Sequence, residues 1–173
     1  MKASMVISVR DLIQSKYGVA TWKQVMQEAN IPETTIFMAV GDVKDTEYYA
    51  LVNAAATVLG HTRKEMWDAV AEHWVGVYTQ KVYSQHYKGF DNVRDFLGHM
   101  NDVHKMVTRA SQNATPPSFS IEYPDASSMV IGYESKRDMF EYFTSLIGAV
   151  TRHFKESVTI HKIGDRKLRL VFN

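Results

Sequence analysis

A short run of polar residues, Tyr133-Glu134-Ser135-Lys136-Arg137, carries the side chains best suited to bind a ligand. If this run is extended, Tyr133, Ser135 and Arg137 point to one face, because side chains alternate along a strand. A phenol, a hydroxyl and a guanidinium together suit a ligand with two carboxylates, since arginine–carboxylate pairs are among the strongest hydrogen-bonded contacts. The alternative is an edge strand whose polar residues face water.

His104 is the second feature with chemical potential. It falls in an apolar stripe of helical spacing, between Met100 and Val107. A neutral imidazole in such surroundings is a common protein ligand of iron, and one axial histidine with two propionates describes haem. The alternative is a core histidine whose ring is satisfied by a backbone carbonyl. The chain has seven histidines, so the residue type alone decides nothing.

The composition limits the class of protein. A chain of 173 residues is expected to form one domain, residues 1–173, with a sizeable core. Twenty Lys and Arg against nineteen Asp and Glu give no basic field for nucleic acid. No apolar run is long enough to span a bilayer. The absence of cysteine excludes disulfides, iron–sulfur clusters and thiolate-ligated haem, and a cytoplasmic location is expected.

Helical periodicity covers the first two thirds of the chain. The expected helices run from Met5 to Tyr17, around Trp22–Met26, around Thr34–Val40, from Asp45 or Thr46 to Gly60, from Thr62 through Tyr78, and from Phe90 to about Ala110.

The period then changes to the alternation of strands. Strands are expected at Phe119–Tyr123, Met129–Ser135, Val158–Ile163 and Lys167–Phe172, with a helix at roughly Arg137–Phe154 and a hairpin turn at Gly164-Asp165. The sequence therefore predicts an α+β fold, in which a helical N-terminal lobe precedes a small antiparallel sheet with an inserted helix.

Three motifs in register, Asn101-Asp102-Val103-His104, Ala114-Thr115-Pro116-Pro117 and Tyr133-x-Ser-x-Arg137, resemble the haem-nitric oxide/oxygen-binding (H-NOX) family. That family includes bacterial gas sensors and the haem domain of animal soluble guanylate cyclase, and the likeness covers essentially the whole chain. It implies haem b held between the two lobes. His104 would be the axial ligand of the iron, Tyr133, Ser135 and Arg137 would hold the propionates, and Pro117 would press on the porphyrin.

The resemblance also assigns the side of the haem where a gas would bind. Tyr142 falls at the position of the distal tyrosine of oxygen-binding members, which places the chain closer to that branch. Val9 stands where some of those members carry tryptophan, and Trp74 stands where they carry asparagine. Taken alone, Tyr142 would be read as a core residue. The other residues expected to line this pocket are Met5, Val75, Tyr78 and Leu146.

The implied function is a gas sensor that binds O2, NO or CO at ferrous haem opposite His104. It would signal to a fused effector or to a partner, which in this family is a histidine kinase, a cyclic-di-nucleotide enzyme or a chemotaxis receptor. No catalytic motif is present, so the chain is not expected to be an enzyme. One alternative is a haem enzyme acting on peroxide or nitric oxide, for which Tyr142 and Trp74 supply no distal acid–base pair. Another is a haem-free regulator, because Trp22–Val40 loosely resembles a helix-turn-helix, although it lacks a basic cluster.

Overall fold

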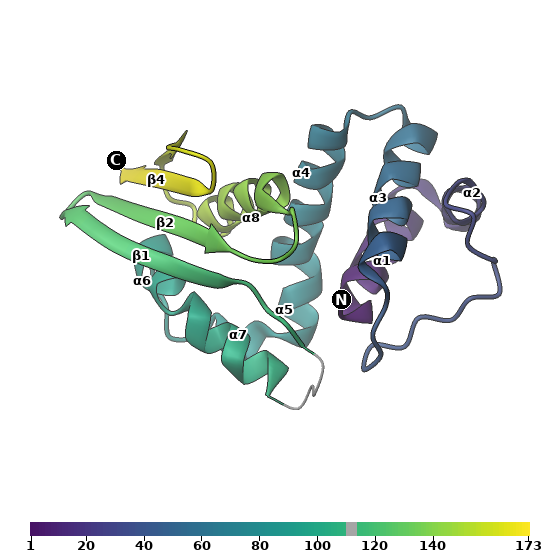
Figure 1. Ribbon diagram of the computed structural model, residues 1–173, viewed down its shortest axis with the longest axis horizontal. Coiled ribbons are helices and arrows are strands. Elements are labelled where there is room, and N and C mark those ends of the chain that lie inside the picture. The colour runs from purple at the N-terminus through teal and green to yellow at the C-terminus, as the bar shows by residue number, and fades with distance from the viewer. Residues whose placement is uncertain (110–113) are drawn as a thin grey trace. The chain divides into compact units, whose positions relative to one another are not determined.

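The computed structural model describes residues 1–109 and 114–173. The chain divides into two compact units, Met1–Trp74 and Val75–Asn173 (Figure 1). None of the described helices is long and apolar enough to cross a membrane. The expected architecture of a helical first part followed by a small antiparallel sheet is confirmed.

The first unit is helical, and its core lies where the helices face one another. The fully buried side chains of α1 include Val6, Val9 and Ile13, which recur at helical spacing. Gly18 separates α1 from α2 with φ of 93°, a backbone conformation that favours glycine, as the sequence predicts. The helices of this unit are α1 (Ala3–Tyr17), α2 (Val19–Glu28), α3 (Asp45–Leu59) and α4 (Arg63–His73).

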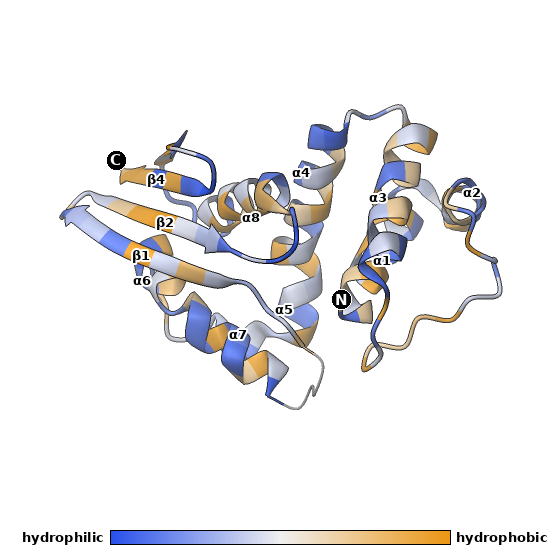
Figure 2. Ribbon diagram, viewed as in Figure 1, coloured by the Kyte–Doolittle hydropathy of each residue, from blue (hydrophilic) through white to orange (hydrophobic). Residues whose placement is uncertain are grey.

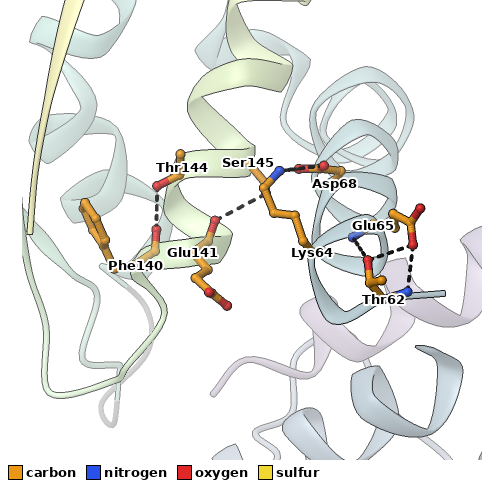
Figure 3. Close-up of polar contacts among 8 residues, drawn as sticks. All are labelled: Thr62, Lys64, Glu65, Asp68, Phe140, Glu141, Thr144 and Ser145. Atoms are coloured by element: carbon orange, nitrogen blue, oxygen red, sulfur yellow. Dashed lines mark hydrogen bonds and ion pairs between the residues drawn. The ribbon is translucent and has the colours of Figure 1, made fainter. Parts of the chain in front are cut away.

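Helix α4 begins with a reciprocal cap (Figure 3). The Thr62 hydroxyl accepts a hydrogen bond from the backbone N–H of Glu65 at 3.2 Å, and the Glu65 carboxylate accepts one from the backbone N–H of Thr62 at 2.7 Å. In the next turn, Lys64 contacts Asp68 at 2.6 Å. These contacts fix the start of α4, because the first backbone N–H groups of a helix lack partners of their own.

Two expectations for this unit are wrong. Residues 34–40 form no helix, and Ile36 and Val40 are 84% and 89% exposed. The apolar residues there lie on a loop, so the helix-turn-helix reading loses its second helix. The N-cap of α3 is Lys44 rather than Asp45 or Thr46, and the Glu47 carboxylate accepts a hydrogen bond from its backbone N–H.

The expected helix from Thr62 through Tyr78 changes its winding after α4. Residues Trp74–Tyr78 form a π-helical turn, η1, and the α-helical pattern returns in α5 (Thr79–Val82). A short 3-10 turn, η2 (Ser84–His86), follows. Trp74 is the last residue of the first unit and Val75 the first of the second, so the chain passes between the units inside this turn.

The second unit combines helices with one antiparallel sheet of strand order β1-β2-β4-β3. Strand β1 is therefore an edge strand, and α8 connects β2 to β3 in sequence. Figure 2 shows apolar residues recurring along β2, all of which is buried except Glu134. The elements are α6 (Val93–Gly98), α7 (Met100–Thr108), β1 (Ser118–Asp125), β2 (Ser128–Glu134), α8 (Phe140–His153), β3 (Val158–Lys162) and β4 (Lys167–Phe172).

The helix expected from Phe90 to about Ala110 is in fact two helices. The chain leaves helical geometry at His99, whose φ and ψ are −99° and 7°, so α6 ends at Gly98 and α7 starts at Met100. Ala110 lies outside the described residues. The burial of the apolar stripe differs on the two sides of this break. Val93 and Leu97 of α6 are buried, whereas no residue of α7 is buried.

Candidate haem-binding site

His104 lies on α7, which is a strongly amphipathic helix. Figure 2 shows apolar and polar residues following one another along it. Its ring packs against Phe119 of β1, with ring centroids 5.3 Å apart. The residue as a whole is half-buried, but its Nδ1 atom is shielded from solvent and makes no hydrogen bond of regular geometry with the described residues. Since no residue of α7 is buried, its apolar stripe is only partly covered by protein.

Burial lowers the pKa of His104, and the nearby backbone carbonyl of Pro117 opposes that effect. Desolvation disfavours the charged imidazolium, so the neutral ring with a free lone pair is the preferred form. A neutral imidazole is the form that binds a metal. Pro117, expected to press on the porphyrin, is therefore placed beside the expected axial ligand.

Aromatic rings continue from His104 into the sheet and α8. Phe119 stacks on Phe143 of α8 at 5.4 Å, and Phe143 stacks on Tyr133 of β2 at 5.0 Å. Phe119 and Tyr133 also face each other in the register of β1 and β2. The expected axial ligand and the first residue of the expected propionate trio thus belong to one packed cluster.

The propionate trio converges, although not by strand alternation. Strand β2 ends at Glu134, close to the expected end at Ser135, and the chain bends at Lys136 and Arg137, so the condition of an extended run over residues 133–137 is not met. The backbone N–H of Arg137 donates to the Ser135 hydroxyl at 3.1 Å, which closes a local turn. The Tyr133 and Ser135 side chains also share a hydrogen bond.

The guanidinium of Arg137 returns toward the segment that precedes β1. Its Nη1 donates to the carbonyl of Thr115 at 2.7 Å, two residues before Pro117. Burial raises the pKa of the Tyr133 phenol, against the opposing influence of Ser135 and of the guanidinium groups of Arg137 and Arg166. The phenol consequently remains a hydrogen-bond donor at neutral pH.

Sequence reasoning missed a second guanidinium at this place. Arg166 donates to the backbone carbonyl of Ser135 at 2.9 Å, and its own carbonyl accepts from the N–H of Tyr133 at 2.8 Å. Arg166 precedes β4, which pairs with β2 as far as Gly132 opposite Lys167. No local motif predicts that Arg166 lies beside Tyr133 and Ser135. Only the pairing register of β2 and β4 would have predicted it.

The residues expected around the gas are placed less completely. Tyr142 is 3% exposed on α8 and Leu146 lies one turn further along the same helix, half-buried. Figure 3 shows how this helix satisfies the hydroxyls beside them: Thr144 donates to the carbonyl of Phe140 at 2.9 Å and Ser145 to that of Glu141 at 3.3 Å. These two hydroxyls are thus satisfied within α8 itself, as is common for Ser and Thr inside a helix.

Three of the expected pocket residues, Trp74, Val75 and Tyr78, share the π-helical turn η1. Val75 and Tyr78 are buried, and Trp74 is half-buried. Single π turns within helices occur frequently at functional sites. Met5, Val9 and Trp74 belong to the first unit, so their approach to the residues of the second unit stays a prediction.

The donor set fits haem. Among the described residues, no group of three or more His, Asp or Glu side chains could hold a metal ion by itself. A single neutral imidazole, a partly covered apolar helix face and a group of donors with two guanidiniums match a macrocycle that brings its own iron and two carboxylates.

Comparison with known proteins assigns the family. The model of the haem-NO-binding family (HNOB) matches residues 2–162. Soluble guanylate cyclase gcy-35 of Caenorhabditis elegans is 21% identical over 92% of this chain and 24% of its own length. The corresponding values for gcy-37 of the same organism are 26%, 84% and 21%. The chain spans about a quarter of the length of these relatives.

Solved structures share the fold over the whole chain. A Cs H-NOX mutant with 4-cyano-L-phenylalanine at site 5 superimposes with a TM-score of 0.89 at 22% identity, covering 100% of this chain and 97% of that one. An oxygen-binding H-NOX domain related to soluble guanylate cyclases, in its oxygen complex, gives a TM-score of 0.86 at 22% identity and covers 100% and 95%. The protein therefore belongs to the haem-NO-binding family, the haem-based gas-sensor family that includes soluble guanylate cyclase.

Proposed function

We propose that this chain binds haem b through His104 and senses a diatomic gas, O2, NO or CO, for a fused or separate signalling protein. The observation that carries the proposal is a packed cluster in the second unit. It joins the half-buried imidazole of His104, whose neutral form is favoured, to a group of donors that suit carboxylates, which begins at Tyr133. Membership of the haem-NO-binding family supports it independently.

Each residue has a distinct part. His104 would hold the haem iron through its imidazole, and Tyr133, Ser135 and Arg137 would hold the propionates by charge-assisted hydrogen bonds. Pro117 would contact the macrocycle from the segment beside His104. The chemistry that haem would supply, when bound, is the reversible binding of a diatomic gas at its iron.

Tyr142 has the part of a donor toward a bound gas. Bound oxygen carries partial negative charge, which a phenol O–H stabilises, whereas nitric oxide gains less from such a donor. The remaining pocket residues exclude water and limit access. They are Met5, Val9, Trp74, Val75, Tyr78 and Leu146.

Signalling follows from a difference in affinity. A partner responds to the gas only if it binds the two states of the chain unequally. We place a histidine kinase, a cyclic-di-nucleotide enzyme or a chemotaxis receptor in that role, with no chemistry performed by this chain itself. We also place the protein in the cytoplasm, where such partners work.

The test is His104→Gly, with His161→Gly as the matched control because His161 is exposed on β3. Purified His104→Gly protein should lack tightly bound haem, and added imidazole should restore a Soret band, since the small ligand replaces the missing ring. The His161→Gly protein should retain haem without imidazole. Full haem content in His104→Gly without imidazole would remove His104 from the proposed role.

A further inference from the structure

The side chain of Asn101 forms a two-way clamp on one residue of the sheet. Its Nδ2 donates to the carbonyl of Phe119 at 2.8 Å, and its Oδ1 accepts from the N–H of the same residue at 2.9 Å. A carboxamide can do this because it has both a donor and an acceptor. The clamp joins α7 directly to β1 across 18 positions of sequence.

The clamp occupies an open edge of the sheet. Strand β1 is at the edge, and the N–H and carbonyl of Phe119 point away from β2 toward α7. Unpaired edge groups of this kind otherwise seek another strand or water. Asn101 thus takes the place that a further strand would have at this one position.

The position of the clamp relates it to His104. Asn101 lies one turn before His104 on α7, so the two side chains are neighbours on the helix surface. The ring of Phe119, whose backbone Asn101 holds, packs against the ring of His104. Pro117, two residues before Phe119, acts on the same imidazole through its carbonyl.

Helix α7 depends on such polar attachment. None of its residues is buried, so core packing does little to fix its position along β1. We propose that Asn101 is a positioning residue: it holds α7 in register with Pro117–Phe119 and thereby sets how firmly His104 stays on the iron. This inference rests on the proposed haem site.

The experiment compares the wild-type chain with Asn101→Ala, Asn101→Asp and the control Asp102→Ala. Asp102 is exposed on the same helix and pairs with Lys105 at 3.6 Å. Two readouts are needed: the iron–histidine stretching band of the ferrous, gas-free protein, and the share of molecules that lose histidine ligation when nitric oxide is added. Hydrogen exchange of the Phe119 amide reports the clamp itself.

The expected result is graded. Asn101→Ala should speed exchange of the Phe119 amide about tenfold, as loss of one hydrogen bond implies. It should also shift or broaden the iron–histidine band and raise the share of molecules that lose histidine ligation severalfold. Asn101→Asp keeps the acceptor but loses the donor, so it should fall between Asn101→Ala and wild type. Asp102→Ala should match wild type.

Opposite outcomes separate the two proposals. Faster exchange at Phe119 with an unchanged iron–histidine band and unchanged loss of ligation would mean that Asn101 is merely structural, which overturns the inference alone. Wild-type protein with bound haem but no iron–histidine band, or with no haem, would overturn the proposed function and the inference with it. If Asn101→Ala does not fold, Asn101→Asp against wild type decides.

Discussion

Arg137 joins two segments of the second unit through its side chain and its backbone. Its guanidinium bonds the carbonyl of Thr115, and its N–H bonds the Ser135 hydroxyl. These contacts draw the end of β2 toward the segment that leads to Pro117. An arginine held in this way is pre-oriented, so less side-chain entropy is lost when it binds a carboxylate.

Arg137→Ala should release haem about tenfold faster or more, because hydrogen bonds to charged groups contribute about 1.5–3 kcal/mol. The measurement is the rate of haem transfer to an excess of a high-affinity haem acceptor. Arg169→Ala is the control, since that exposed guanidinium pairs with Asp125 at 3.6 Å. Equal transfer rates for the two variants would count against the propionate role.

For Tyr142 we propose a different role, the choice of gas. Tyr142→Phe removes only the hydroxyl of a side chain that is 3% exposed. If that hydroxyl donates to bound oxygen, oxygen should dissociate about fivefold faster, because one hydrogen bond is worth about 1 kcal/mol. Dissociation of nitric oxide should change little.

Stopped-flow release of both gases tests this prediction. Tyr87→Phe is the control, since Tyr87 is a half-buried tyrosine whose hydroxyl accepts from Thr79 at 3.0 Å. An equal change in the release of both gases from Tyr142→Phe would identify Tyr142 as a packing residue. A change in neither would place its hydroxyl away from the gas.

At the scale of elements, periodicity predicts most of this fold but not its interruptions. The four strands follow from the alternation of apolar residues, the helix between β2 and β3 from their 3-4 spacing, and the hairpin from the Gly164-Asp165 turn. The stripe from Val93 to Val107 keeps helical spacing across the break at His99, so spacing alone cannot show that one helix has become two. The π turn at Trp74–Tyr78 is hidden for the same reason.

The candidate site shows the same limit. His104 and the trio of Tyr133, Ser135 and Arg137 are candidates from the sequence because their motifs stand in the register of a known family, whereas their residue types alone would leave other interpretations open. Their convergence could not be predicted, since it depends on a turn beyond β2 rather than on strand alternation. Asn101 and Arg166 act through contacts between distant segments, which no local pattern encodes.

At the scale of the whole molecule, we propose that gas binding is read as a change between the two units. The expected axial ligand His104 and the trio of Tyr133, Ser135 and Arg137 belong to Val75–Asn173. Three residues expected to line the gas pocket, Met5, Val9 and Trp74, belong to Met1–Trp74. A partner that binds both units would detect the gas if the distance between the units differs in the gas-free and gas-bound states.

Binding of nitric oxide or oxygen to ferrous protein should therefore change the distance between the units. Because the chain has no cysteine, spin labels can be placed without removing native thiols. Gln24→Cys on α2 and His161→Cys on β3 put labels on exposed residues of different units. The distance distribution from pulsed electron resonance should shift on adding gas.

The control pair, Gln24→Cys with Asn53→Cys, lies within the first unit and should give no shift. If the distance between the labels at Gln24→Cys and His161→Cys also stayed constant, a partner would have to detect a change within Val75–Asn173. In that case α7 would be the first element to label.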